Sequence, residues 1–322
     1  MKIVITDYIE ADLEWEKEQF DKLGIEFLIY QMKHALPNQL VEKLIDADII
    51  IVNMAHINRE VLSRLNKCKL IIRHGVGYDN IDVKAATEFK ILVSYIPDYC
   101  IEEVAEQAAM LLLTAYRKFV LQFESMKLSI GKSEWDFSPV IPVRRLSGKK
   151  AGLIGCGRIG QKVLKILRGF DIDVLVYDPL LSEKRLKGLG ISRKSLEEVL
   201  THSDMISIHC TLDPTTYHMI GETELKMMKP EAIIVNTARG GIIDAEALAK
   251  ACKEKWIAGA GIDVYEKEPP PYNFPLIGLE NVILTPHLSW YSEDAGWDIR
   301  KKIVEDVSRF VNGEKPRFPI NL

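Results

Sequence analysis

The segment AGLIGCGRIGQKVLKILRGF, Ala151–Phe170, carries the clearest structural signal in the chain. It holds an apolar strand, three glycines in the spacing G-x-G-x-x-G (Gly155, Gly157 and Gly160) and the beginning of a helix. The first glycine permits a tight turn, the second lets a pyrophosphate approach the backbone, and the third allows close packing of helix on strand. The helix N-terminus offers N–H groups and a positive dipole end to phosphates. The stretch therefore predicts a dinucleotide-binding βαβ unit, and the alternative is an ordinary βαβ turn.

The next apolar run, DVLVYDP, ends in Asp178. In a dinucleotide site an acidic residue at this place accepts hydrogen bonds from the adenosine ribose. A carboxylate would also repel a 2′-phosphate, so NAD is favoured over NADP. Lys184 and Arg185 follow closely in the sequence and leave NADP open. Without a dinucleotide, Asp178 would be a surface aspartate.

Strand-like and helix-like segments alternate twice along the chain. Near-continuous apolar strands separated by helices indicate a parallel sheet with helices on both faces. The sequence thus predicts an α/β protein with two doubly wound parallel-sheet domains. The expected strands are KIVIT, EFLIYQ, ADIIIVN, KLIIRHG and ILVSYIP in the first unit, and AGLIG, DVLVYDP, MISIHC, AIIVNTA, IAGAGIDV and NVILTPH in the second.

Helical spacing of apolar residues predicts one long helix over residues 101–123 and a surface helix over residues 293–313. Residues 129–150 contain scattered glycines and prolines and are expected to form a connector. We expect the domains to comprise residues 1–98 plus 291–322 and residues 99–290.

Composition narrows the functional classes. The chain has 322 residues and a formal net charge of −4, which gives no electrostatic case for binding nucleic acid or an anionic membrane. Five cysteines are scattered without a C-x-x-C pair, so the sequence indicates no metal site and no disulfide framework. No signal peptide or membrane-spanning run is recognisable. A reducing, cytoplasmic setting is expected.

Polar residues follow three strands of the second unit, where ligands bind on open α/β sheets. They are Arg239 after AIIVNTA, Asp263 and Glu268 after IAGAGI, and His287 after NVILTP. Each alone could be a solvated or ion-paired loop residue. Together they supply a guanidinium that can hold a carboxylate, a histidine that can transfer a proton, and a carboxylate that can orient the histidine ring. These are the groups needed to reduce a 2-oxo acid with a nicotinamide cofactor.

The chain resembles the D-isomer-specific 2-hydroxyacid dehydrogenases over essentially its whole length. The segments that carry the resemblance are GCGRIG with Asp178, VNTARGGIIDAEAL, GIDVYEKEP and LTPH, in the family's order and spacing. It implies a flavodoxin-like substrate domain, a Rossmann NAD domain, a homodimer, NAD as cofactor and a small 2-oxo or 2-hydroxy acid as substrate. By resemblance Arg239 binds the substrate, and Glu268 pairs with His287, which is the acid/base.

The resemblance implies further contacts. Cofactor contacts fall on Gly155, Gly157, Arg158, Ile159, Gly160, Asp178, Cys210, Thr211, Thr216, Thr237, Ala238, Arg239, Asp263 and His287. Substrate contacts fall on Gly75, Val76 and Gly77, whose backbone N–H groups would face the carboxylate, and on Arg239, His287 and Trp290. From the residues alone, Gly75–Gly77 could equally be a strand-to-helix turn.

Two features depart from the common family pattern. Thr211 in HCTLDP stands where relatives often carry proline, and Gln107 stands where many carry histidine. PDYCIEEVAEQAAMLLL and HLSWYSE look closest to the C-terminal-binding-protein branch and its bacterial dehydrogenase relatives. That branch leaves an NADH-sensing protein–protein adaptor as the alternative function. A formate dehydrogenase is a further alternative, against which Glu268 argues because the histidine's partner there is typically glutamine.

Overall fold

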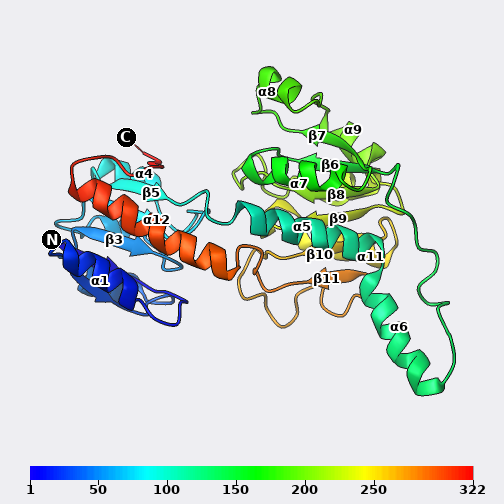
Figure 1. Cartoon of the computed structure of the whole chain (residues 1–322), viewed down its shortest axis with the longest axis horizontal. Coiled ribbons are helices and arrows are strands. Elements are labelled where there is room, and N and C mark those ends of the chain that lie inside the picture. Colours follow the sequence, from blue (N-terminus) through cyan, green and yellow to red (C-terminus); the bar gives the residue numbers. More distant parts are fainter. Residues whose placement is uncertain (322) are drawn as a thin grey trace. The chain divides into compact units, whose positions relative to one another are not determined.

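The computed structural model describes residues 1–321 and divides into two compact units (Figure 1). Unit 1 comprises residues 1–100 together with residues from Tyr291 onward, and unit 2 comprises Ile101–Trp290. Leu322, the last residue of the predicted segment 291–322, lies outside the described residues. Both units are parallel α/β sheets with helices, which confirms the predicted fold class.

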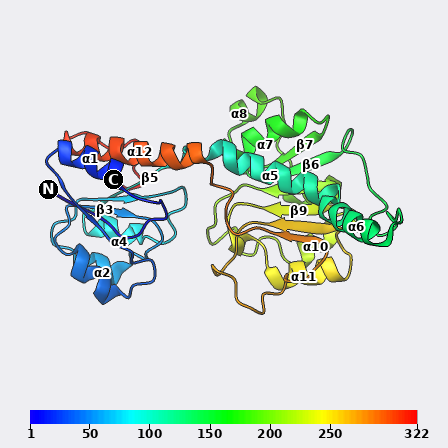
Figure 2. The same cartoon turned by 60° about the horizontal axis from the view of Figure 1, so that its bottom comes forward.

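Unit 1 is built on a five-stranded parallel sheet in the order β2-β1-β3-β4-β5. The central strand β3 is buried on both faces because helices cover both, which explains its unbroken run of isoleucine and valine. Figure 2 shows α1 and α12 on one face and α2 on the other. The strands are β1 (Lys2–Ile5), β2 (Glu26–Ile29), β3 (Ile49–Val52), β4 (Leu70–Arg73) and β5 (Leu92–Tyr95), and the helices are α1 (Glu14–Lys22), α2 (Pro37–Leu44), α3 (Arg59–Leu62), α4 (Val83–Glu88) and α12 (Glu293–Val311).

Unit 2 is built on a six-stranded parallel sheet in the order β11-β10-β9-β8-β6-β7. Strand order reverses at β6, which pairs with β7 on one side and β8 on the other, so this is the position where open α/β sheets bind ligands. The strands are β6 (Lys150–Ile154), β7 (Asp173–Tyr177), β8 (Met205–Ile208), β9 (Ile233–Asn236), β10 (Gly259–Ile262) and β11 (Val282–Leu284).

Helices cover both faces of this second sheet. Figure 2 shows α5 and α7 on one face and α10 and α11 on the other. The helices of unit 2 are α5 (Ile101–Tyr116), α6 (Phe119–Lys132), α7 (Arg158–Arg168), α8 (Glu183–Gly188), α9 (Leu196–His202), α10 (Glu222–Met227) and α11 (Ala245–Lys253), with a 3-10 turn η1 (Gly240–Ile242).

The predicted single helix over residues 101–123 is wrong. The chain breaks between α5 and α6, where Lys118 takes a left-handed backbone with a φ of 54°. Helix α6 then continues to Lys132, so the first part of the predicted 129–150 connector is helical. In Figure 1, α6 extends from the end of α5, and the segment after it returns to β6. No helix among the described residues is long and apolar enough to cross a membrane.

Candidate active site

The glycine loop lies between β6 and α7, at the reversal of strand order. Gly155 has a φ of 93°, and a Cβ there would lie 2.7 Å from the Cys210 backbone nitrogen. A Cβ on Gly160 would lie 2.5 Å from the Gly155 carbonyl oxygen. Gly157, the residue before α7, has nothing within 4 Å of its Cβ position. Two glycines thus close the turn, and the third leaves open backbone at a helix N-terminus, which fits a pyrophosphate.

The Asp178 carboxylate is held by backbone amides at the end of β7. The Cys156 amide donates to its Oδ2 over 2.8 Å, and the Leu180 and Leu181 amides each donate to its Oδ1 over 2.9 Å. Cys156 belongs to the glycine loop, so the carboxylate is fixed beside that loop. This is the position from which it could accept hydrogen bonds from an adenosine ribose.

The segment after β8 carries Cys210, Thr211 and Thr216. The Thr216 hydroxyl donates to the Thr211 carbonyl over 2.7 Å and accepts from the Asp213 amide over 2.8 Å. Burial raises the pKa of the Cys210 thiol to about 11, so it stays protonated near neutral pH. The Thr216 hydroxyl therefore stabilises the conformation of this loop through hydrogen bonds to the loop's own backbone.

Arg239 follows β9 on a turn that Asn236 holds. The Asn236 side chain donates to the Arg239 carbonyl over 2.8 Å and accepts from the Ala238 amide over 3.0 Å. A Cβ on the next residue, Gly240, would lie 2.0 Å from the Tyr265 backbone. Only glycine lets the arginine segment lie against the segment that carries Glu268.

Thr237, on the same turn, shows whether the site fits a cofactor. Its hydroxyl is buried and has no hydrogen-bond partner within residues 1–321. A bound group that brings a hydrogen-bonding atom would satisfy it. Together with the open backbone at Gly157, this buried hydroxyl fits a dinucleotide lying across the strand ends.

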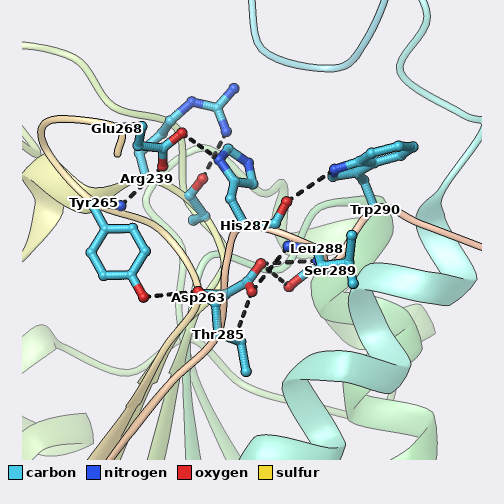
Figure 3. Close-up of polar contacts among 10 residues, drawn as sticks. Arg239, Asp263, Tyr265, Glu268, Thr285, His287, Leu288, Ser289 and Trp290 are labelled. Atoms are coloured by element: carbon cyan, nitrogen blue, oxygen red, sulfur yellow. Dashed lines mark hydrogen bonds and ion pairs between the residues drawn. The ribbon is translucent and has the colours of Figure 1, made fainter. Parts of the chain in front are cut away.

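Glu268 and His287 form an ion pair. His287 Nδ1 lies 2.7 Å from Glu268 Oε2, and Glu268 Oε1 accepts from the Tyr265 amide over 3.0 Å. Figure 3 shows Arg239 beside both. Partial burial alone would raise the pKa of Glu268, but the hydrogen bond and charge of His287, the Tyr265 amide and the charge of Arg239 hold it below the ordinary value. Glu268 is therefore an ionised acceptor that fixes one ring nitrogen.

Asp263 organises the segment that carries His287. Its carboxylate is completely buried and accepts from the Thr285 hydroxyl over 2.5 Å, the Leu288 amide over 3.1 Å and the Ser289 amide over 3.0 Å (Figure 3). The Ser289 hydroxyl donates to it as well. Both oxygens of Asp263 thus accept from residues on either side of the histidine.

The histidine itself has an unusual backbone. His287 has a φ of 54°, in the left-handed region. Its amide donates to the Thr285 carbonyl over 3.0 Å, and its carbonyl accepts from the Trp290 indole over 3.0 Å. The Tyr265 hydroxyl also donates to the Thr285 carbonyl, over 2.8 Å. Surrounding contacts therefore hold a conformation that a non-glycine residue rarely adopts.

Unit 1 carries the predicted substrate loop, Gly75–Gly77, directly after β4. The Gly75 amide donates to the Arg73 carbonyl over 2.9 Å, and a Cβ on Gly75 would lie 2.6 Å from the Arg73 guanidinium. The preceding residue, His74, forms a buried pair with Glu10, with Nε2 and Oε1 3.2 Å apart. Burial would raise the pKa of Glu10, but the hydrogen bond and charge of His74 lower it to about 2.

The structure brings most of the predicted site residues to one sheet edge. Those at the strand ends of unit 2 are Gly155, Gly157, Arg158, Ile159, Gly160, Asp178, Cys210, Thr211, Thr216, Thr237, Ala238, Arg239, Asp263, Glu268, His287 and Trp290. Sequence reasoning missed Asn236, Tyr265, Thr285 and Ser289, which hold the reactive side chains in place. Hydroxyl residues on both sides of the histidine in LTPHLS were the one available signal. Within residues 1–321 no group of three or more His, Cys, Asp or Glu residues could hold a metal ion.

Comparisons with known proteins show which family this chain resembles. Residues 109–289 match the family described as D-isomer specific 2-hydroxyacid dehydrogenase, NAD binding domain. A glyoxylate reductase of Korarchaeum cryptofilum is 38% identical over 88% of this chain and 85% of its own. The solved D-lactate dehydrogenase of Aquifex aeolicus, complexed with NAD and lactic acid, has a TM-score of 0.85 and 31% identity, covering 97% of this chain and 96% of its own. An acyclic imino acid reductase in complex with NADPH and D-Arg has a TM-score of 0.88 and 30% identity, covering 99% of this chain and 100% of its own.

Proposed function

Because the chain belongs to the D-isomer-specific 2-hydroxyacid dehydrogenase family, we propose that it transfers hydride between NAD(H) and a small D-2-hydroxy acid or the matching 2-oxo acid. The observation that carries the proposal is the 2.7 Å contact between His287 and Glu268, beside Arg239 and on the sheet that holds the glycine loop. A proton donor, an anion anchor and a dinucleotide site on one sheet are the parts that this reaction requires.

Each residue has a separate task in the reduction. NADH, when bound, supplies the hydride that reaches C2 of the 2-oxo acid. Arg239 holds the substrate carboxylate through parallel N–H bonds, a task for which a guanidinium is shaped. His287 gives its ring proton to the oxygen that becomes the hydroxyl, and takes it back in the oxidation. Glu268 fixes Nδ1 of the ring, so that Nε2 is left to face the substrate.

The remaining predicted contacts support these steps. Val76 and Gly77 offer backbone N–H groups to the substrate carboxylate, whereas the predicted donor Gly75 already gives its amide to the Arg73 carbonyl over 2.9 Å. Trp290 limits the space for the substrate side chain. Arg158 and Ile159 lie at the beginning of α7 for the pyrophosphate, and Thr237 and Ala238 lie at the end of β9 for the nicotinamide. In this assignment unit 1 is the substrate domain and unit 2 the NAD domain.

Steady-state rates of NADH oxidation with glyoxylate, hydroxypyruvate, pyruvate and a bulkier 2-oxo acid test the proposal. We expect turnover with at least one of them, and the ranking will name the preferred side chain. Tight NADH binding without turnover on any 2-oxo acid would instead support an adaptor of the C-terminal-binding-protein kind. The relatives reported above are named as enzymes, so the adaptor is not favoured. Membership of that particular branch stays a prediction.

We also propose that the chain forms a homodimer through α6 and the segment after it. Several large apolar side chains are exposed there, more than a monomer surface usually gathers in one place. Four of them, Met126, Trp135, Phe137 and Ile141, line a pocket of about 270 Å³ with neighbouring polar groups, and a second copy could fill it. The exposed residues are Phe119, Val120, Phe123, Met126, Leu128, Ile130, Trp135, Phe137 and Ile141. Sedimentation of the wild type and of Phe123→Ser with Ile130→Ser tests this, and an unchanged mass would refute it.

The cysteines support a cytoplasmic location. Cys68, Cys100, Cys156, Cys210 and Cys252 all carry free thiols. Persistent free thiols suit a reducing compartment. Immunodetection in fractionated cells would test the location, and recovery in an oxidising compartment would contradict it.

A further inference from the structure

Arg193 lies against the turn that carries Asp178, although fifteen positions separate them in the sequence. Val176 and Arg193 form a parallel bridge, and the Lys194 amide donates to the Val176 carbonyl over 2.9 Å. The backbone of residue 193 is thus fixed beside β7, two residues before Asp178. From there its side chain reaches the turn formed by residues 178–183.

The Arg193 guanidinium contacts this turn with each of its nitrogens. NH1 donates to the Asp178 carbonyl over 2.5 Å, and NH2 donates to the Leu181 carbonyl over 2.6 Å. Nε lies 3.1 Å from Glu183 Oε1. A planar guanidinium can donate from all three nitrogens to three acceptors at once, and a lysine ammonium cannot reproduce this arrangement.

The same turn directs the Asp178 carboxylate. The Leu180 and Leu181 amides that donate to Asp178 Oδ1 lie between the Asp178 and Leu181 carbonyls that Arg193 holds. The Leu180 side chain is 91% exposed and does not anchor the turn by packing, whereas Leu181 is buried. Arg193 and Leu181 therefore share the task of keeping those amides aimed at the carboxylate.

The charge of Arg193 is already engaged. Glu183 and two carbonyl oxygens surround the guanidinium, so it is poorly available to a further anion such as the 2′-phosphate of NADP. The Asp178 carboxylate, in contrast, lies beside the glycine loop, where it accepts from the Cys156 amide. The cluster favours a ribose with two free hydroxyls over a ribose phosphate.

We propose that Arg193 is a positioning residue for cofactor choice: it fixes the 178–183 turn so that Asp178 selects NAD over NADP. This inference rests on the proposed dinucleotide site and is independent of which 2-oxo acid is the substrate. It assigns a part in the selectivity for NAD over NADP to a residue that is neither in the glycine loop nor the acidic residue Asp178 itself. Arg193 acts on the cofactor only through Asp178.

Binding titrations separate this role from general stability. We measure the Kd of NADH and of NADPH by fluorescence for the wild type, Arg193→Leu and Arg193→Lys. Roughly tenfold weaker NADH binding is expected for both variants, because misdirected hydrogen bonds to a charged group lose about that much. NADPH binding should weaken less, so the ratio of the NADPH Kd to the NADH Kd should fall. kcat at saturating NADH should stay near wild type, since the reacting groups lie at other strand ends.

Matched variants make the test specific. Arg168, whose guanidinium donates to the Gly190 carbonyl over 3.3 Å, lies in the same unit and makes no hydrogen bond to the turn within residues 1–321. Arg168→Leu should leave both Kd values unchanged. In an Asp178→Ala background, Arg193→Leu should cause no further loss of NADH affinity.

Three outcomes would overturn the inference. The first is an unchanged NADH Kd in Arg193→Leu. The second is a larger loss of affinity for NADPH than for NADH, which would make Arg193 a phosphate ligand. The third is an equal loss of NADH affinity on Arg193→Leu with and without Asp178. If the wild type binds neither dinucleotide, the proposed function itself fails, which is a distinct result.

Discussion

Ser289 donates both its backbone amide and its hydroxyl to one oxygen, Oδ2, of Asp263. The other oxygen accepts from Thr285 and Leu288. One buried carboxylate thereby holds the chain on both sides of His287. Asp263 thus positions the backbone of the acid/base residue, and Glu268 positions its ring. Mutation of one or the other separates these two contributions.

Asp263→Asn should lower kcat by about tenfold or more and reduce stability by about 2 kcal/mol, because an amide nitrogen would face donors that now meet a carboxylate oxygen. NADH affinity should change little if the role is to place His287. Paired measurements of kcat, NADH Kd and urea unfolding check this. A variant with weak NADH binding and normal kcat would instead place Asp263 in direct contact with the nicotinamide.

His287→Gln should lower kcat by about 10²–10⁴-fold, which is the usual range for loss of a general acid. Glu268→Gln should lower it less, because the ring remains and only its fixation is weakened. The NADH Kd should stay near wild type in both. Rapid-mixing rates and fluorescence titration supply the two measurements, and near wild-type kcat in His287→Gln would remove it from the reaction.

Arg239→Lys should raise the KM for the 2-oxo acid by about a hundredfold, because a lysine cannot make two parallel bonds to a carboxylate. The control is Arg144→Lys, at a surface pair in which NH2 lies 3.2 Å from Glu231. Initial rates over a range of substrate concentration give both constants. Equal KM values for the two variants would argue against Arg239 as the anchor.

The Glu10–His74 pair predicts a pH-dependent contribution to stability. The pKa of Glu10 falls from 4.5 to about 2 on folding. The contribution, about 3 kcal/mol, is therefore fully present above pH 4.5 and is lost as the pH falls towards 2. The stability deficit of Glu10→Gln should shrink by about 1 kcal/mol per pH unit below 4.5.

Urea unfolding of the wild type and Glu10→Gln, at pH 6 and at pH 3.5, measures this deficit. Glu42→Gln is the control because Glu42 is exposed, and its deficit should stay small at both values. A Glu10→Gln deficit that does not depend on pH would mean that packing, and not charge, accounts for the pair.

Local sequence signals predicted the strands and the glycine loop because each depends on neighbouring residues. The break between α5 and α6 could not be predicted in this way, since no glycine or proline lies between Tyr116 and Phe119. Both flanking segments have helical spacing, and only the left-handed backbone of Lys118 separates them.

The supporting contacts of the site depend on register between distant segments. Ile262 pairs with Leu284, so the following residues, Asp263 and Thr285, meet at the strand ends. Nothing in either segment alone specifies this pairing. Glu10 and His74 follow β1 and β4, which are separated by β3 in the sheet, so their contact is equally invisible to a local pattern.

The left-handed backbone of His287 has a consequence for anyone who evolves this protein in the laboratory. Glycine and asparagine adopt such a conformation at lower energetic cost than most side chains. A screen that rewards heat resistance alone would therefore enrich replacements at position 287. The most thermostable variants would then lack catalytic activity, so each round of selection for stability must also select for turnover.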